Sequence, residues 1–320
     1  IFHTPGLLRT QIKKAYVSLN KLLISWFEDK TNRMKYIPLM VAGILLVFCS
    51  TKKSPSTANE KEFLRGKRLA EHKMKSLKEV SGLAASSNNP GLLWAHNDSG
   101  NSPDIFLIDQ NLSVRQRYIL AGVGNRDWED IAVGRGPDST KTYVYVGEIG
   151  DNDAAYPLKF IYRFVEPVLD SVQDQAVIIS EFETITFQLS DQRKDTEAFL
   201  IDPKTQDLIV ISKREQPVNV YRIGYPYSTN DTITANQVTT LPLTQIVAAS
   251  FSPDGNELLM KNYNHIYYWK NTRNLSLMEL LNEPPKEIPY IVEPQGESIT
   301  WAIDNSGFFT LSEINKGKKS

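Results

Sequence analysis

The chain has 320 residues, 41% hydrophobic and 23% charged, a composition that excludes disordered and fibrous classes for most of its length. Its formal net charge is −1, but residues 1–49 hold seven Lys or Arg and two Asp or Glu, which leaves 29 basic and 35 acidic residues for 50–320. This acidic remainder speaks against nucleic-acid binding, and the single cysteine excludes an internal disulfide.

The first predicted element is an apolar stretch at residues 37–48, which follows Met34 and Lys35 and ends at Cys49. It is too short for an ordinary membrane-spanning helix and has the length of a signal-peptide core. LeuValPheCys at 46–49 resembles the lipobox of bacterial lipoproteins, which implies a lipid on Cys49. The alternative is that residues 7–48 form a membrane-associated helical region.

These features divide the chain into four parts. We expect an upstream extension at 1–33, a lipoprotein signal peptide at 34–49, a flexible tether at 50–60 and a folded domain at 61–320. The expected location is the envelope of a bacterium, where a lipid anchor would hold the protein on the periplasmic or outer surface.

The folded part contains a repeat of about 50 residues, visible in two sets of positions. The first set opens an apolar segment and is spaced by 50, 68, 50 and 50 residues: Glu79, Glu129, Glu197, Val247 and Glu297. The second set closes the next apolar run and is spaced by 50, 65, 50 and 50 residues: Asp98, Glu148, Lys213, Tyr263 and Glu313. Short strands repeated at this period predict an all-β fold of the β-propeller type, because one small sheet cannot bury its apolar face alone.

Further strands are predicted after the first two of most repeats. Alternating or apolar runs bounded by turn residues indicate strands at 104–108, 115–120, 160–165, 184–189, 218–223, 238–243 and 265–269. The count favours five blades. A sixth blade would have to come from the 15 to 18 extra residues of the second interval, which are too few for a complete one.

The fifth repeat stops soon after Glu313, so its sheet lacks outer strands. An open strand edge is a liability that proteins avoid. We therefore expect residues 61–78, which precede the first repeat, to supply an outer strand and close the ring.

Acidic residues gather at one end of the predicted ring, here called the mouth, where each first strand begins and each second strand ends. Seven of the ten repeat positions are carboxylates, and further acids follow in AspTrpGluAsp at 127–130 and GlyAspAsnAsp at 150–153. Crowded carboxylates repel one another unless a cation or donor groups satisfy them. Oxygen ligands suit a hard divalent ion, so we expect calcium, held by some of Glu79, Asp98, Asp127, Glu129, Asp130, Glu148, Asp151, Asn152, Glu197, Glu297 and Glu313.

A structural role competes with this interpretation, since an acid at a strand start often caps backbone N–H groups of a neighbouring strand. Strict repetition favours capping, whereas the break at Val247 and Tyr263 and the extra acids of the second repeat favour a site. The four histidines and one cysteine show no zinc spacing, and no glycine loop for a nucleotide is present.

Three other residues are candidates at the same mouth. His96 could act as an acid or base, or could bond to a turn. Lys213 and Tyr263 could contact a bound ligand, and Lys213 could instead neutralise the acidic rim.

Five phrases carry a resemblance: HisAsnAspSerGly at 96–100, AspTrpGluAsp at 127–130, GlyGluIleGlyAspAsn at 147–152, ThrGluAla at 196–198 and GlnGlyGluSerIle at 295–299. On these the chain resembles a family of bacterial envelope lipoprotein β-propellers, with Glu148 where that family more often has Asp. It is more distantly similar to calcium-dependent propeller hydrolases of the gluconolactonase-like and esterase-like phytase groups. That similarity implies a divalent-metal site at the mouth and hydrolysis of esters, lactones or phosphoesters.

Three functional hypotheses follow. The first is an envelope-anchored, monomeric propeller that binds calcium and a small or glycan-like ligand at the mouth. The second is a calcium-dependent hydrolase in which Glu129 or Glu148 activates water, with His96 as a further candidate. The third is a protein-interaction scaffold with no ligand at all.

Overall fold

The structure, a computed structural model, describes residues 62–71 and 76–313 of the chain. The expected extension at 1–33, the expected signal peptide at 34–49 with Cys49, and the tether at 50–60 all lie outside these residues. The described part is an all-β fold, as the repeat predicts.

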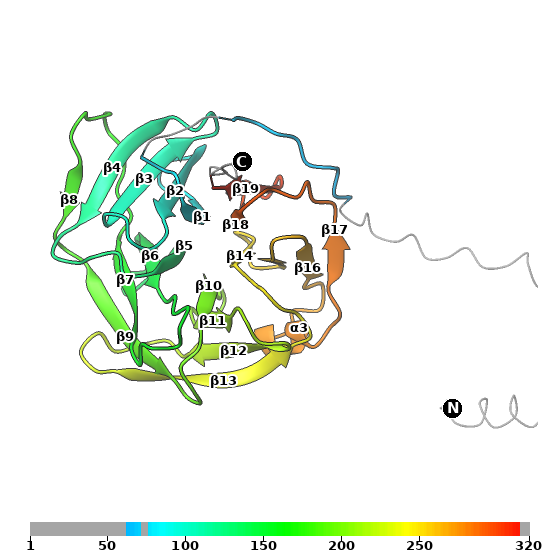
Figure 1. Ribbon diagram of the computed structural model, residues 1–320. Helices are drawn as coiled ribbons and strands as arrows, with labels where there is room; N and C mark the ends of the chain where they lie inside the picture. The colour runs from blue at the N-terminus through cyan, green and yellow to red at the C-terminus, as the bar shows by residue number, and fades with distance from the viewer. Residues whose placement is uncertain (1–61, 72–75, 314–320) are drawn as a thin grey trace, which may run out of the picture. The chain divides into compact units, whose positions relative to one another are not determined.

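Five strands that open the repeats lie around a common centre (Figure 1). They are β1 (Val80–Ala85), β5 (Trp128–Arg135), β10 (Thr196–Ile201), β14 (Ala248–Phe251) and β18 (Gly296–Trp301). Each contacts the next, and β18 contacts β1, so the order is cyclic. Each also pairs antiparallel with the strand that follows it: β2 (Leu92–Asn97), β6 (Thr142–Glu148), β11 (Leu208–Ser212), β15 (Glu257–Lys261) and β19 (Phe308–Ser312).

Outer strands continue four of these hairpins, and all seven predicted outer strands are found, six of them with shifted ends. They are β3 (Asp104–Asp109), β4 (Val114–Leu120), β7 (Lys159–Val165), β9 (Glu183–Leu189), β12 (Val218–Ile223), β13 (Ile233–Leu241) and β16 (Ile266–Lys270). Three short elements were not predicted: β8 (Val177–Ile179), β17 (Lys286–Ile288) and the helix α3 (Leu277–Leu281), which Ser276 and Glu279 cap. A strand of three residues and a helix of five residues, less than two turns, are too short to show their periods.

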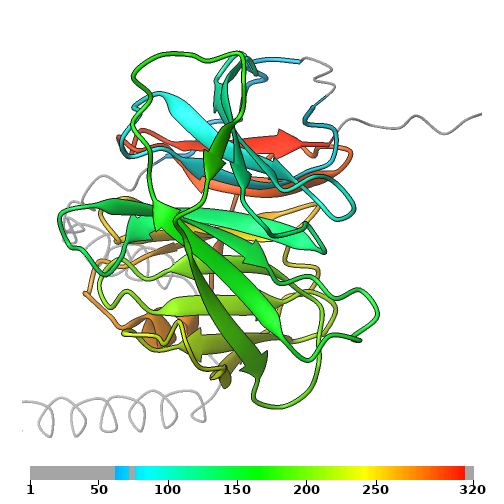
Figure 2. The same ribbon diagram turned by 90° about the vertical axis from the view of Figure 1, so that its left-hand side faces the viewer.

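The extra residues of the second interval form an excursion from β7 to β9 rather than a sixth blade. Its strand β8 leaves the second repeat and pairs in parallel with β4 of the first. A second parallel pairing, between β13 and β9, joins the second and third repeats into one eight-stranded sheet. Figure 2 shows this side of the molecule, with β8 beside the first sheet.

Closure by an N-terminal strand is wrong for the described residues, because 62–71 and 76–78 contain no strand. Five of the ten residues at 62–71 are charged and none follows an alternating pattern: Glu62, Arg65, Lys67, Arg68 and Glu71. The segment is held by one aromatic side chain instead. The ring of Phe63 lies 4.8 Å from that of Tyr268 and 6.0 Å from that of Phe308, so it joins the start of the domain to the fourth and fifth sheets.

Replacing this anchor should weaken the domain. We expect Phe63→Ala to lower the free energy of unfolding by about 1–2 kcal/mol, less than a fully buried Phe would cost because this ring is only partly buried. Denaturant unfolding of the full chain measures the change. Leu64→Ala is the control, since that side chain is 79% exposed. Equal stability of the two variants would show that Phe63 does not anchor the segment.

Candidate functional site

Bulges at the start of four first strands define how the repeats align at the mouth. Trp128 pairs with Glu148 and Asp130 with Gly147, so Glu129 is an extra residue in β5. The same shift leaves Glu197 extra in β10, Glu297 in β18 and Ser81 in β1. An extra residue bends a strand and redirects its side chain. The bulged positions therefore carry three glutamates and one serine.

This alignment corrects the sequence reading in two places. Ser81, not Glu79, is equivalent to Glu129, and Glu79 falls two residues earlier, level with Asp127 and Asp195. Glu148 pairs with Trp128 as Asn97 pairs with Val80, so its equivalent is Asn97 rather than Asp98. The spacing in sequence hid this, because the equivalent residues lie 48 apart (Ser81 and Glu129) and 51 apart (Asn97 and Glu148), whereas non-equivalent acids happen to lie 50 apart.

Three groups of carboxylates come together at the mouth, each with oxygens within 4.8 Å of one another. They are Asp98, Asp127 and Glu129; Asp98, Glu297 and Glu313; and Glu129, Asp195 and Glu197. Asp98 and Glu129 each belong to two groups. Of the predicted metal ligands, Asp98, Asp127, Glu129, Glu197, Glu297 and Glu313 are thus brought together.

Asp195 belongs to the site and was missed by the sequence analysis. It lies two residues before the bulged Glu197, just as Asp127 lies two residues before the bulged Glu129. The shared Asp-x-Glu spacing in AspTrpGlu and AspThrGlu is the pattern that could have found it.

Basic and phenolic groups satisfy one side of the cluster. The Lys213 ammonium donates to Glu197, and the Arg214 Nε lies 2.7 Å from Asp195 Oδ2. The Tyr263 hydroxyl donates to Glu297 Oε1 at 2.6 Å. Lys213 Nζ also lies 5.5 Å from the centre of the Tyr263 ring. The two residues proposed to contact a ligand therefore both bond to carboxylates of the cluster.

The remaining carboxylates hold their protons more tightly than in water. Burial raises the pKa of Asp127 to about 6, and the charges of Asp98 and Asp195 add to the effect. Burial raises the pKa of Glu129 well above its usual range, with Glu197 the largest of the neighbouring charges. Burial also raises the pKa of Asp98. An ion-free mouth is therefore an unfavourable place for several negative charges.

The backbone of Gly150 closes one side of this cluster. A Cβ at this position would lie 2.2 Å from Glu129 Oε1 and 2.5 Å from Asp127 Oδ2. No real Cβ tolerates such distances, so any side chain here would displace the two carboxylates. This is the physical role of the second glycine in GlyGluIleGlyAspAsn.

Glu148, a predicted ligand and base, is held elsewhere. Its Oε2 accepts hydrogen bonds from the indole of Trp128 and the hydroxyl of Tyr162, both at 3.2 Å, and its Oε1 lies 3.7 Å from Arg126 Nε. It belongs to none of the three carboxylate groups found among the described residues. These contacts give it a structural role between β5, β6 and β7.

Asp130 and His96 are core residues rather than members of the mouth. Asp130 is fully buried and accepts the backbone N–H groups of Ile131 at 2.9 Å and Phe199 at 3.2 Å, which ties β5 to β10. His96 is also fully buried, with its ring edge-on to Trp128. Burial lowers the pKa of His96 to about 4, so the ring is neutral near pH 7.

The other predicted ligands shape the surrounding loops. Asp151 accepts the backbone N–H groups of Ala155 at 2.6 Å and Tyr156 at 2.9 Å, and Asn152 accepts from Arg214. Glu79 Oε2 accepts from the Asn101 amide at 3.0 Å. Asp151 and Asn152 therefore order the loop after β6, while Glu79 binds the turn after β2.

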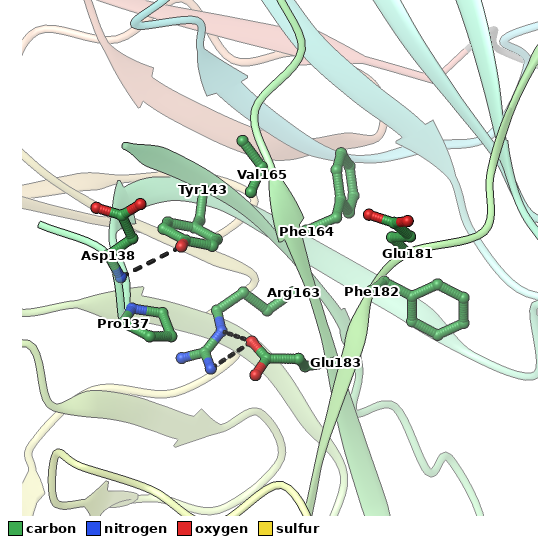
Figure 3. Close-up of a pocket in the computed structure, with 9 residues that line it drawn as sticks. All are labelled: Pro137, Asp138, Tyr143, Arg163, Phe164, Val165, Glu181, Phe182 and Glu183. Carbon is green, nitrogen blue, oxygen red and sulfur yellow. Dashed lines mark hydrogen bonds and ion pairs between the residues drawn. The ribbon is translucent and has the colours of Figure 1, made fainter. Parts of the chain in front are cut away.

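A separate open pocket of about 550 Å³ lies on the outer part of the second sheet and contains none of these carboxylates. Figure 3 shows Arg163 of β7 bonded to Glu183 of β9 beside Tyr143, Phe164 and Phe182. Arg163 is buried and already paired. The walls come from β7, from the start of β9 and from the β5–β6 hairpin. We assign this pocket no part in the chemistry of the mouth.

Comparison with known proteins adds no family and no function. No family model and no curated protein matches the chain. Among the residues that the structure describes, no helix has the length and apolar character needed to cross a membrane. One similar solved structure is hydrazine synthase of Kuenenia stuttgartiensis, with 12% identity and a TM-score of 0.38, over 76% of this chain and 98% of that chain. At that similarity, the function has to be argued from the residues of the mouth.

Proposed function

We propose that the described domain is a five-bladed β-propeller that binds a divalent cation at its mouth. The cyclic order of β1, β5, β10, β14 and β18 supports the propeller, as does the run of further strands outward from four of them. Two parallel pairings between repeats and a two-stranded last sheet depart from a regular blade.

One observation carries the cation proposal. Asp127 is only 6% exposed, and within the described residues its carboxylate accepts no hydrogen bond and forms no ion pair, although it lies against Asp98 and Glu129. Burying a carboxylate without a partner is costly, so such a group indicates a missing positive charge. The ligand atoms that this group offers are carboxylate oxygens, and a hard cation such as calcium prefers these ligands.

Binding is the function that these contacts support best. Calcium takes six to eight oxygen ligands, so three carboxylates leave positions that a small or glycan-like ligand could fill. Hydrolysis would need a base at the ion, and two of the three expected catalytic groups, Glu148 and His96, are held in structural contacts.

The first test is thermal unfolding of the full chain after treatment with EDTA, followed by addition of calcium or magnesium. At a calcium concentration about 100-fold above Kd we expect roughly 3 kcal/mol of added stability, or a rise in Tm of about 5 to 10 °C. Asp127→Asn should remove most of this rise, because it removes a ligand without changing shape.

The control is Asp304→Asn, which alters an exposed turn acid that bonds to Ser306. This variant should retain the full response to calcium. If wild type shows no shift with either ion, the cation proposal fails and the acids return to a role in capping strands.

A further inference from the structure

The three carboxylate groups form a row, because neighbouring groups share a residue. Asp98 links the group of Glu297 and Glu313 to the group of Asp127 and Glu129, and Glu129 links that group to Asp195 and Glu197. A carboxylate has two oxygens and can bind two cations at once. The row therefore offers three adjacent cation positions, provided that the cation binding proposed above occurs.

Among the described residues, the ion pairs of this row fall at one end, while Lys159 and Arg126 act on Asp127 only from a greater distance. Lys213 donates to Glu197, and Arg214 pairs with Asp195, so two of the three acids in the last group already have a cationic partner. In the middle group, within the described part of the chain, neither Asp98, Asp127 nor Glu129 forms an ion pair with Lys or Arg. The buried Asp127 carboxylate, for which the described residues supply no hydrogen bond or ion pair, belongs to this middle group.

We propose that Lys213 is a built-in cation that fills the third position and so limits the number of divalent ions at the mouth. An ion between Glu129, Asp195 and Glu197 would lie close to the Lys213 ammonium, which donates to Glu197. Two positive charges so close together repel each other strongly in a poorly solvated site. Divalent ions would then bind only in the two groups that contain Asp98.

The proposal predicts a change in stoichiometry that a merely structural lysine would not cause. Equilibrium dialysis with calcium, followed by metal analysis of the full chain, counts the ions bound per molecule. We expect Lys213→Met to bind one more calcium ion than wild type, because it removes the ammonium from the third position but keeps most of the side chain, and Arg214, whose side chain is 46% exposed, can turn to solvent. Lys141→Met removes an exposed charge that pairs with Asp138, and it should bind the same number as wild type.

A second variant tests the same point without touching the lysine. Glu197→Gln removes a ligand of the third group alone, so the wild-type number of ions should not change. Asp98→Asn should lower that number, since Asp98 belongs to both of the other groups. Circular dichroism of each variant shows that it is folded.

The outcomes separate this inference from the proposed function. If wild type binds no calcium, the proposed function fails and this inference fails with it. If wild type binds calcium but Lys213→Met binds the same number, or Glu197→Gln binds fewer, then Lys213 does not fill a cation position and only the inference is overturned.

Discussion

Glu166→Ala is expected to lower the Tm by about 10 °C, the largest loss of stability among the variants considered. Glu166 is 2% exposed and follows β7. Its carboxylate accepts five hydrogen bonds at 2.7 to 3.1 Å, from the hydroxyls of Ser86 and Thr142, the indole of Trp94 and the backbone N–H groups of Ser87 and Asn88. These donors belong to the first and second repeats, so one side chain joins the two.

The size of the effect follows from the buried hydrogen-bond donors that lose their acceptor when Glu166 is replaced. Each buried donor without a partner costs about 1–3 kcal/mol, and the Trp94 indole and the Ser86 hydroxyl are both buried. We expect a total of about 4 kcal/mol, measured by thermal and denaturant unfolding of the full chain. Glu181→Ala, which alters an exposed acid at the other end of the same excursion, should leave the Tm unchanged. A similar Tm for both variants would mean that water replaces the lost carboxylate.

Glu129→Gln should change stability in opposite directions with and without calcium. In EDTA the substitution removes the free-energy cost of keeping an acid, ionised or protonated, in a buried site among like charges, so the Tm should rise. With calcium, the variant lacks a ligand that two carboxylate groups share, so the rise in Tm seen for wild type should largely disappear.

The dependence on pH gives an independent check. The folded-state pKa of Glu129 lies well above the unfolded value because of burial and the charges of Glu197, Asp98 and Asp127, so the native state binds more protons between the two values. The contribution of Glu129 to stability is therefore fully present below its pKa in the unfolded state, and it is lost as the pH rises through its pKa in the folded state. Burial also raises the pKa of Glu197 to about 8, which acts in the same direction, so we expect the Tm of ion-free wild type to fall as the pH rises from 6.5 to 8 and to fall less in Glu129→Gln.

The groups whose titration would make stability increase with pH do not titrate in this pH range. His96, with a pKa lowered to about 4, makes stability increase with pH only below its usual value of 6.5. Burial lowers the pKa values of Lys159 and Lys261 to about 8, so these two groups make stability increase with pH only above pH 8.

Glu148→Gln is the matched control for Glu129→Gln. It should lower the Tm, because it weakens bonds to Trp128 and Tyr162, and it should keep the response to calcium. If Glu129→Gln instead lowers the Tm in EDTA and keeps the calcium response, Glu129 is a strand cap and not a ligand.

The strand pattern could be predicted from the sequence because it depends on periodic burial. The five first strands each begin with buried residues, and the apolar residues within them, such as Ile131 in β5 and Ile299 in β18, recur at a nearly constant spacing. The order of the outer strands could not be predicted, since the parallel pairing of β8 with β4 depends on where a chain excursion packs.

The candidate site could be predicted only in part, for a different physical reason. The acids at the mouth recur with the strands, so Asp98, Asp127 and Glu129 could be found by position. Glu148 has the same charge as Asp98 and nearly the same place in the repeat, but in the strand pairing it lies one residue earlier. There its carboxylate accepts a hydrogen bond from the Trp128 indole. Glu166 has no counterpart in the repeat, and its role depends on a turn that is about 80 residues away in sequence.

The two parallel pairings between repeats also bear on how this chain can be rearranged. In a ring of independent blades, one repeat can be duplicated, deleted or moved without breaking hydrogen bonds within its neighbours. Here β8, which is part of the second repeat, is hydrogen-bonded into the first sheet, and the β13–β9 pair joins the second and third repeats, while the fourth and fifth have sheets of their own. New chain ends from circular permutation, or an inserted domain, are therefore best tolerated in the connections around β14 and β18 and least tolerated at 166–182.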